Sequence, residues 1–526
     1  MSLARFGGLS LALCIAALLS ACNLPPASHP EDTRKAIGLE VSAQTRLGQA
    51  HQSLREQAGA APETSGIYPL TDPQEAFAAR ALLARHAEKT LDVQYYIWRD
   101  DKTGLLLLHE LLLAADRGVR VRLLLDDGGT SGLDAQLMAL HRHPHAQVRV
   151  FNPFVLRNML KPLGYVTEFS RTNRRMHNKS FSADAQATIV GGRNVGNEYF
   201  GATNGVLFAD LDILVLGPVV QDIEEDFDRY WNNVAAYPIE QVASKHRKAT
   251  VDALRSSGAA LAQSPAAQDY RQALERTSFV QKLLQADLPM EWATARLLTD
   301  PPEKIQAEAK NKHLIGEQLR RALGNPQHSL DLVSPYFVPT QDGADAFAQL
   351  RASGPRVRIL TNALEATDVA IVHSGYAKYR KPLLRAGVQL YEMRAQAPEY
   401  ADEAERVKLN LSQLGSSGSS LHAKTFAVDG KRAFVGSFNF DPRSMHLNTE
   451  MGLIIDSPTL ARQVSESFDQ LIPSRAFRLS LTDDDQLRWH SGVGDPPPVY
   501  DTEPQTRWYQ RWMLWFLGKL PIEWML

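Results

Sequence analysis

The chain has 526 residues, of which 44% are hydrophobic and 22% are charged. This balance is typical of a globular protein with a buried core, and it excludes a disordered, a collagen-like or a polytopic membrane protein. The 57 basic and 59 acidic residues give a net charge of −2, whereas a dedicated nucleic-acid binder usually carries a basic surplus. Two cysteines are too few for a disulfide framework, and the length predicts either several domains or one large duplicated unit.

Residues 1–21 have the pattern of a secretory signal. Arg5 precedes an apolar stretch of about a dozen residues, which is shorter than the ~20 residues of a membrane-spanning helix. The sequence Leu19-Ser20-Ala21-Cys22 resembles the lipobox of bacterial lipoproteins, which implies cleavage before Cys22 and lipid attachment to it. Asn23 is not the aspartate that favours inner-membrane retention in enteric bacteria. We expect a periplasmic lipoprotein, with the outer membrane favoured over the inner; the alternatives are an unlipidated signal peptide and a buried helix.

A polar, proline-containing stretch leads into a dense α/β region. Residues 22–65 are expected to form a tether that ends in a helix. Residues 66–240 form the first predicted unit, with a strand at 91–97, a helix at 104–116 and a strand at 119–125. The pair Arg117-Gly118 ends the helix. This order is typical of a βαβ unit in a parallel or mixed sheet.

The same order returns in a second predicted unit at residues 321–475. A strand at 329–334, a helix at 343–352 and a strand at 357–360 follow one another. Asp331 matches Asp92 at an offset of 239 residues, and Arg358 matches Arg122 at an offset of 236. Nearly constant offsets indicate an internal duplication. Residues 241–320, which are rich in Ala, Gln and Lys, are expected to form a helical connector.

Residues 476–526 form a C-terminal tail with a tryptophan-rich helix. Trp508, Trp512 and Trp515 recur at i, i+4 and i+7, which places them on one face of a helix that extends to Pro521. Tryptophan favours the membrane interface, and the nearby Arg507, Arg511 and Lys519 suit anionic head groups. The sequence leaves two interpretations open: an interfacial membrane segment, or a helix docked on the core with its aromatic rings buried.

The duplication is sharpest in one pair of motifs, each of the form His-x-Lys-x4-Asp followed by Val-Gly-x-x-Asn. All corresponding positions are separated by 245 residues: His177, Lys179, Asp184, Val190, Gly191 and Asn194 in the first half, and His422, Lys424, Asp429, Val435, Gly436 and Asn439 in the second. Two such motifs in register are very rare by chance. They are the strongest functional signal in the chain.

The residue types in these motifs indicate chemistry on a phosphate. On a strand, residues i and i+2 share a face, so each histidine and its lysine point the same way. A pseudo-two-fold axis would bring both pairs into one shared cleft. Imidazole serves as nucleophile or general acid/base near neutral pH, and lysine holds a phosphate. Asp184 and Asp429 are expected to fix their turns rather than touch the substrate.

A nucleophilic histidine also needs a carboxylate on its second ring nitrogen. Asp212 and Glu450 are the candidates, because they lie 35 and 28 residues beyond His177 and His422 and each opens an apolar strand. The alternative is that both are surface carboxylates at strand starts.

Paired motifs of this kind resemble the phospholipase D superfamily, and the match is closer still to the C-type bacterial cardiolipin synthases. The resembling blocks run from about residue 65 to the C-terminus: Thr90–Trp98, Phe151–Phe154, Asn173–Ser180, Ser334–Pro339 and Gly436–Ser444. The resemblance implies an α/β fold of two duplicated phospholipase D-like halves, with mixed sheets flanked by helices and one shared active-site cleft. The lipobox is a departure from the family pattern.

The resemblance also implies a metal-independent phosphatidyl transfer in two steps. His177 would attack the phosphorus of a donor phospholipid to form a phosphohistidine, and His422 would act as acid and then as base. Lys179 and Lys424 belong to the same catalytic motifs, and Asn194 and Asn439 would bind substrate. The product would be cardiolipin, made from phosphatidylglycerol with phosphatidylethanolamine as donor.

Other functions of the same fold stay open on the sequence alone. They are a phospholipase D-type hydrolase that releases phosphatidic acid, a phosphodiesterase or nuclease, and a scaffold with an inactive site. No nucleotide loop or metal motif is evident, so no cofactor, metal or nucleic-acid partner is expected. Arg174-Arg175 before His177 is equally compatible with a grip on a second phosphate and with a solvated pair.

Overall fold

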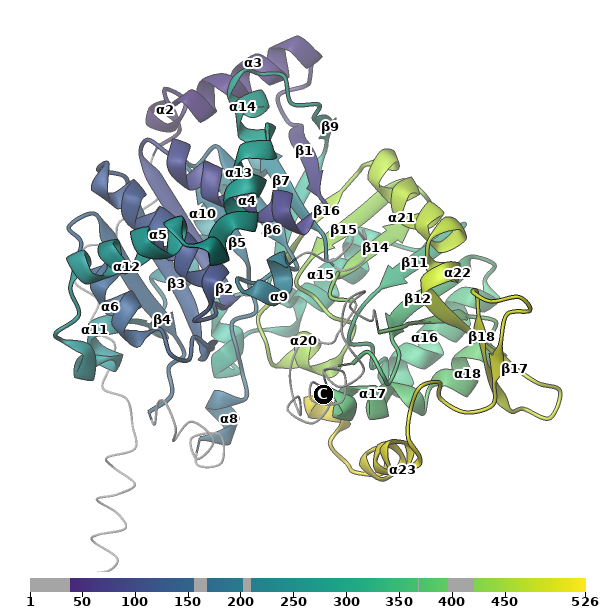
Figure 1. Cartoon of the computed structure of the whole chain (residues 1–526). Coiled ribbons are helices and arrows are strands. Elements are labelled where there is room, and N and C mark those ends of the chain that lie inside the picture. The colour runs from purple at the N-terminus through teal and green to yellow at the C-terminus, as the bar shows by residue number, and fades with distance from the viewer. Residues whose placement is uncertain (1–37, 156–167, 202–209, 368, 396–420) are drawn as a thin grey trace, which may run out of the picture.

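A computed structural model describes residues 38–155, 168–201, 210–367, 369–395 and 421–526. The predicted signal segment and Cys22 therefore lie outside the described residues. The chain forms two α/β halves that lie side by side, the first purple to teal and the second green to yellow (Figure 1). None of the helices in the described ranges has the length and apolar character needed to cross a membrane.

The first half is built on a nine-stranded sheet with the strand order β8-β4-β3-β2-β5-β6-β7-β1-β9. Its strands are β1 (Ser65–Leu70), β2 (Thr90–Ile97), β3 (Arg120–Gly129), β4 (Ala146–Phe151), β5 (Ser180–Ala183), β6 (Ala187–Gly191), β7 (Asp212–Leu216), β8 (Ala236–Pro238) and β9 (Glu291–Ala293). Its main helices are α3 (Arg46–Ala58), α4 (Pro73–His86), α5 (Lys102–Asp116), α6 (Asp134–His141), α10 (Pro218–Trp231), α12 (Val251–Gln263), α13 (Gln268–Arg276) and α14 (Phe279–Leu284). Shorter helices are α2 (Leu39–Ser42), α8 (Phe169–Thr172), α9 (Asn197–Phe200) and α11 (Ile239–Val242).

The second half is built on a ten-stranded sheet with the order β10-β16-β15-β14-β11-β12-β13-β17-β18-β19. Its strands are β10 (Ala295–Thr299), β11 (Ser329–Val333), β12 (Arg356–Asn362), β13 (Gln389–Met393), β14 (Thr425–Val428), β15 (Arg432–Gly436), β16 (Met451–Ile455), β17 (Ala476–Leu481), β18 (Leu487–Ser491) and β19 (Val499–Tyr500). Its helices are α15 (Ile315–Leu323), α16 (Thr340–Ala352), α17 (Ala370–Ala377), α18 (Arg380–Arg385), α20 (Pro442–His446), α21 (Pro458–Gln470), α22 (Ile472–Arg475) and α23 (Trp508–Leu517).

The central strands of the two sheets follow the same order, β4-β3-β2-β5-β6-β7-β1 in the first and β13-β12-β11-β14-β15-β16-β10 in the second, which confirms the predicted duplication and the mixed α/β fold. Strands β2, β3 and β4 are parallel, and so are β11, β12 and β13, because helices connect them. Strands β5 and β14 then join their sheets antiparallel to β2 and β11. Helix α5 ends at Asp116 as predicted, with Gly118 at a φ of +90°, a conformation that glycine adopts without strain.

The matching Asp and Arg residues of the two halves form equivalent buried ion pairs. Asp92 accepts hydrogen bonds of 2.6 and 2.8 Å from Arg122, and Asp331 accepts bonds of 2.6 and 2.9 Å from Arg358. Each pair joins the first parallel strand of its sheet to the second. The matching Asp and Arg positions in the sequence therefore correspond to the same cross-strand ion pair in each half.

Two predicted boundaries differ from the structure. The connector at 241–320 contains helices α12 to α14, but it also contributes β9 to the first sheet and β10 to the second. The second unit does not end at residue 475, because β17, β18 and β19 extend its sheet into the predicted tail. In both places, strand pairing with a distant segment decides the boundary, and local composition does not reveal it.

An apolar core joins the two halves. Val190, Ile213 and Val215 of β6 and β7 pack in one buried cluster with Val435 and Leu453 of β15 and β16. These four strands lie at the border of the halves in Figure 1. Burial of this surface fixes the orientation of one half relative to the other.

We expect Asp331→Ala to lower the free energy of unfolding by ~3–5 kcal/mol, because it leaves the buried Arg358 without its main partner. Asp469→Ala is the matched control, since Asp469 is an exposed partner of the same arginine and its loss should cost below ~1 kcal/mol. Denaturant titration of both variants measures the difference. Equal losses would contradict the structural role of the buried bridge.

Candidate functional site

The two motif histidines lie in extended segments directly before β5 and β14. The backbone N–H of His177 donates to the carbonyl of Thr449 in the other half, at 2.9 Å. Met176 and Thr449 also form an isolated parallel bridge. The motif of the first half is thus held by backbone pairing to the segment that precedes β16. The structure supports one site at the junction of the halves.

Each histidine is hydrogen-bonded to a carboxylate from the opposite half. His177 Nδ1 lies 2.7 Å from Glu450 Oε2, and His422 Nδ1 lies 2.6 Å from Asp210 Oδ2. The prediction that Glu450 would serve the histidine of its own half, His422, is wrong in its pairing. The carboxylates cross because the duplicated halves face one another across a pseudo-two-fold axis.

The prediction that Asp212 orients His177 is also wrong, because the carboxylate of this segment that contacts a histidine is Asp210, and its partner is His422. Asp212 is buried against Arg80, whose Nη2 donates to it at 2.7 Å, and it lies 3.3 Å from Arg193. Asp210 lies two residues before β7, beyond the end of the strand, where its carboxylate reaches His422 of the other half. Residues i and i+2 share a strand face, so alternation cannot distinguish these two carboxylates.

Glu450 is buried in a hydroxyl-rich environment. Ser437 and Ser444 both donate to its carboxylate, the latter at 2.9 Å, in addition to its bond with His177. Burial raises the pKa of Glu450 to about 7, although Lys179 and these hydroxyl groups act in the opposite direction. Glu450 therefore changes its charge near neutral pH.

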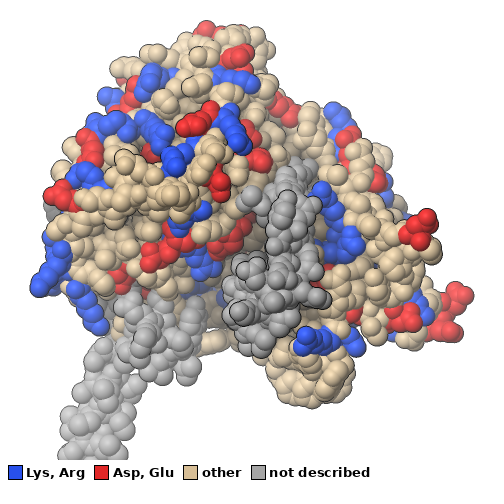
Figure 2. All heavy atoms as spheres, viewed as in Figure 1, with Lys and Arg blue, Asp and Glu red and all other residues tan. Residues whose placement is uncertain are grey.

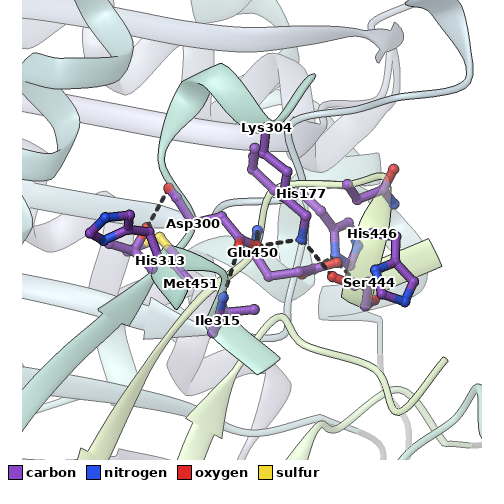
Figure 3. Close-up of polar contacts among 12 residues, drawn as sticks. His177, Asp300, Lys304, His313, Ile315, Ser444, His446, Glu450 and Met451 are labelled. Atoms are coloured by element: carbon purple, nitrogen blue, oxygen red, sulfur yellow. Dashed lines mark hydrogen bonds and ion pairs between the residues drawn. The ribbon is translucent and has the colours of Figure 1, made fainter. Parts of the chain in front are cut away.

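A buried ion pair from the segment that links the halves, Lys304 with Asp300, contacts Glu450 and its neighbour Ser444 (Figure 3). Lys304 Nζ donates to Asp300 at 2.7 Å and to the carbonyl of Ser444 at 2.8 Å. Asp300 and Glu450 also exchange hydrogen bonds, from Glu450 N to Asp300 Oδ2 and from Asp300 N to the Glu450 carbonyl, each at 3.0 Å. No sequence motif indicated Asp300 or Lys304, and Ser437 and Ser444 lie in the family block Gly436–Ser444, where the sequence assigns them no role.

Asp210 differs electrostatically from Glu450 although its geometry is equivalent. Burial opposes its ionisation, but His422 and Arg193 outweigh this and lower the pKa of Asp210 to about 2. Asp210 is therefore a permanent anion at neutral pH. The two histidines consequently have partners of different charge behaviour.

The two lysines occupy equivalent positions. Lys179 Nζ donates to the backbone carbonyl of His177 at 2.6 Å, and Lys424 Nζ donates in the same way to His422. Burial lowers the pKa of Lys179 to about 7. Burial and the two lysines also lower the pKa of both histidines, that of His177 most strongly, so both imidazoles are neutral at neutral pH in the absence of substrate.

The motif aspartates bind backbone N–H groups rather than the other side chains of the site. Asp184 accepts hydrogen bonds from the N–H groups of Glu88, Lys89 and Thr90, which lead into β2. Asp429 accepts equivalent bonds from the N–H groups of residues 327–329, which lead into β11. Both aspartates have positive φ values, as tight turns demand. Each fastens its motif hairpin to the neighbouring strand.

The motif asparagines are buried and only partly bonded. Asn194 Oδ1 accepts from the N–H of Ile97 at 3.2 Å. Asn194 Nδ2 and Asn439 Oδ1 have no hydrogen-bond partner among the described residues. Gly191 and Gly436 of the same motifs lie where a side chain would collide with the neighbouring strand, with a Cβ 2.2 Å from Asp212 Oδ1 and 2.4 Å from the Met451 carbonyl. The predicted substrate-binding role of Asn194 and Asn439 therefore stays a prediction.

Two tyrosines that the sequence did not single out contact the histidines. The ring centroids of Tyr96 and His177 are 4.9 Å apart, and those of Tyr199 and His422 are 5.2 Å apart; both pairs pack edge to face.

Arg174 and Arg175 are not a solvated pair. Arg175 is buried against Asp126 at 3.2 Å, and Arg174 donates to the carbonyls of Lys304 and His446.

Among the side chains that the structure describes, no three of the types His, Cys, Asp and Glu gather as metal ligands. The two histidines, two lysines and two partner carboxylates are instead arranged as paired proton-handling and cationic groups.

Known proteins have similar sequences and a similar fold. The family model "Cardiolipin synthase, PLD-like domain" matches residues 82–231 and 319–472. Cardiolipin synthase C of Escherichia coli is 45% identical over 465 residues, covering 88% of this chain and 97% of that protein. The major cardiolipin synthase ClsA of Bacillus subtilis is 26% identical, covering 79% and 70%. A phosphatidylserine synthase structure from Haemophilus influenzae aligns with a TM-score of 0.50 at 15% identity, covering 82% and 91%, and shows the shared fold. The chain belongs to the phospholipase D-like family of cardiolipin synthases.

Proposed function

We propose that the protein is a phosphatidyltransferase that makes cardiolipin from phosphatidylglycerol and a donor phospholipid. The observation that carries the proposal is the pair of His–carboxylate contacts across the two halves, 2.7 and 2.6 Å long, in a chain 45% identical to a cardiolipin synthase. The resemblance to C-type enzymes favours phosphatidylethanolamine as the donor.

In the first step, His177 acts as the nucleophile. Its Nδ1–H donates to Glu450, which fixes the tautomer and leaves the lone pair of Nε2 for attack on the donor phosphorus. The N–P bond forms as the bond from phosphorus to the head-group oxygen breaks. His422 gives its proton to that oxygen, and Asp210 stabilises the imidazolium form of His422.

The lysines prepare the site for an anionic substrate. Burial and the positive charges of Lys179 and Lys424 lower the pKa of both histidines, and a bound phosphodiester offsets the lysine charges. Substrate binding therefore raises the pKa of His422 and favours its protonated form. The lysines also stabilise the charge that develops on the phosphoryl oxygens.

In the second step, neutral His422 removes the proton from the terminal glycerol hydroxyl of phosphatidylglycerol. The oxygen attacks the phosphohistidine, the P–O bond forms, and the P–N bond to His177 breaks. Water in place of this hydroxyl would give phosphatidic acid, so the hydrolase is the alternative product of the same site.

The site also fits a membrane-bound location. The substrates are phospholipids, and the predicted lipid on Cys22 would keep the enzyme at the membrane that contains them. The lipobox and Asn23 support placement on the periplasmic side, with the outer membrane favoured.

Lipid analysis tests the function. Purified protein with phosphatidylglycerol and isotope-labelled phosphatidylethanolamine should yield cardiolipin that carries the labelled phosphatidyl group, with chelator present. We expect His177→Asn and His422→Asn each to lower turnover by about 10³-fold or more, because each removes one of two proton-handling groups. His145→Asn, at an exposed histidine, is the control. Labelled phosphatidic acid as the main product would identify a hydrolase instead.

The pH profile tests the role of Glu450. Because its pKa is raised to about 7, the carboxyl group ionises only as the pH rises through neutrality, so kcat/KM should fall below about pH 7. Glu450→Gln should lower the rate and remove this acidic limb. Asp210→Asn should also lower the rate but retain the limb, since Asp210 is already ionised above about pH 2. An acidic limb that persists in Glu450→Gln would refute the assignment.

Cys22→Ser should remove the lipid and move most of the protein from washed membranes to the soluble periplasmic fraction, because acyl chains supply most of the membrane affinity. Cys14→Ser, within the predicted signal segment, is the matched control and should stay in the membrane. Fractionation with incorporation of labelled fatty acid measures both properties. Label in the Cys22→Ser protein would disprove lipidation at this position.

A further inference from the structure

The C-terminal helix α23 exposes aromatic side chains instead of burying them. Trp508, Trp512 and Trp515 are 73%, 59% and 60% exposed, whereas Leu514 alone in this helix is buried. The docked interpretation with buried rings is therefore wrong. We call the following set the aromatic surface: Trp508, Tyr509, Trp512, Trp515, Phe516 and Trp524. So many large exposed aromatic residues on one short segment are unusual for a surface that faces only water.

The charge of this segment has one sign. Arg507, Arg511 and Lys519 are its charged residues, and no acidic residue occurs between positions 507 and 522. Lys519 Nζ lies 4.7 Å from the ring centroid of Trp515. Figure 2 shows the helix as a largely uncharged projection at the lower edge of the molecule, with basic side chains beside it. Tryptophan next to lysine and arginine suits the boundary between anionic head groups and acyl chains.

The aromatic surface is fixed to the second half. Leu526 is buried, and Glu523 accepts a hydrogen bond of 2.7 Å from Tyr379. The N–H of Arg443 donates to the Leu526 carbonyl at 2.7 Å, and its guanidinium donates to the Met525 carbonyl at 2.8 Å. The next residue in α20, Ser444, donates to Glu450. One short helix therefore holds both the C-terminus and the partner of His177.

The aromatic surface also reaches the first half. The ring of Trp524 lies 6.4 Å from that of Phe169 in α8, which is itself partly exposed. Arg443 Nη2 donates to Asn173 Oδ1 at 2.7 Å, only four residues before His177. Figure 1 shows α8, the C-terminus and α23 along the same lower edge. The surface thus spans the junction at which the two motifs meet.

We infer that the aromatic surface docks on a lipid bilayer containing anionic lipids, with α23 lying in the interface. At ten residues the helix is too short to span the bilayer. Its contact would place the junction of the halves beside the lipids, so that a substrate lipid reaches the site without passing through water. This inference deepens the proposed function, but membrane docking itself is measurable without turnover.

The test uses the full mature chain with Cys22→Ser, so that attached lipid does not mask docking. Trp508→Ser/Trp512→Ser/Trp515→Ser should bind vesicles of equal parts phosphatidylglycerol and phosphatidylcholine at least about tenfold more weakly, because it removes three of the six side chains of the aromatic surface. Val493→Ser/Val499→Ser, at two exposed apolar positions outside α23, should bind unchanged. Sedimentation and quenching of tryptophan fluorescence by brominated lipid measure binding.

Point variants are preferable to deletion of residues 507–526, because deletion would also remove the buried Leu526 and the Glu523 contact. Thermal unfolding should be the same for the parent and the triple variant. The ratio of turnover on vesicles to turnover on a short-chain monomeric lipid should fall about tenfold in the triple variant, in line with its binding.

Equal vesicle binding by the parent and the triple variant would overturn the inference. So would a parent dimer that the triple variant dissociates without a change in vesicle binding, because the surface would then be an interface between copies. Weaker binding by the triple variant in a protein that turns over no lipid would support docking and refute the proposed function separately.

Discussion

The crossed pairing of each histidine with a carboxylate from the other half is the interaction on which the site depends. Neither half contains a complete pair, so the site exists only when the apolar surfaces of β6, β7, β15 and β16 are packed together. The fold therefore couples the stability of the interface to the alignment of both imidazoles. An internal duplication supplies two matching motifs, and the pseudo-two-fold axis makes them interdependent.

Equal geometry does not give the two histidines equal chemistry. Glu450 is fully buried and accepts hydrogen bonds from two serine hydroxyl groups, and burial raises its pKa to about 7. Asp210 lies near His422 and Arg193, which keep it ionised. A displacement at phosphorus needs one imidazole that keeps its lone pair and another that passes through the cationic form. In the proposed mechanism, the different carboxylates divide these two tasks between otherwise equivalent motifs.

Segments outside the repeats complete the arrangement. Asp300 and Lys304, from the chain that links the halves, hold Glu450 and the carbonyl of Ser444. Helix α20 carries Ser444 against Glu450 and Arg443 against the C-terminus. The C-terminal aromatic surface is consequently connected to the catalytic carboxylate through two adjacent residues. The aromatic surface and the alignment of His177 therefore share one structural support.

The sequence alone determined the duplication, the α/β class, the motif residues and the amphipathic C-terminal helix, because each depends on local periodicity or on spacing that a repeat preserves. It placed Asp184 and Asp429 in tight turns, but it could not indicate that their carboxylates bind N–H groups of residues 88–90 and 327–329, which are distant in the sequence. It could not select Asp210 over Asp212, or assign Glu450 to His177. Those contacts join residues 212 and 273 positions apart, and only the packing of the two halves brings them together. The tertiary structure likewise decided that Asp300 and Lys304 support the site and that the tryptophans face outward, because burial depends on the whole fold.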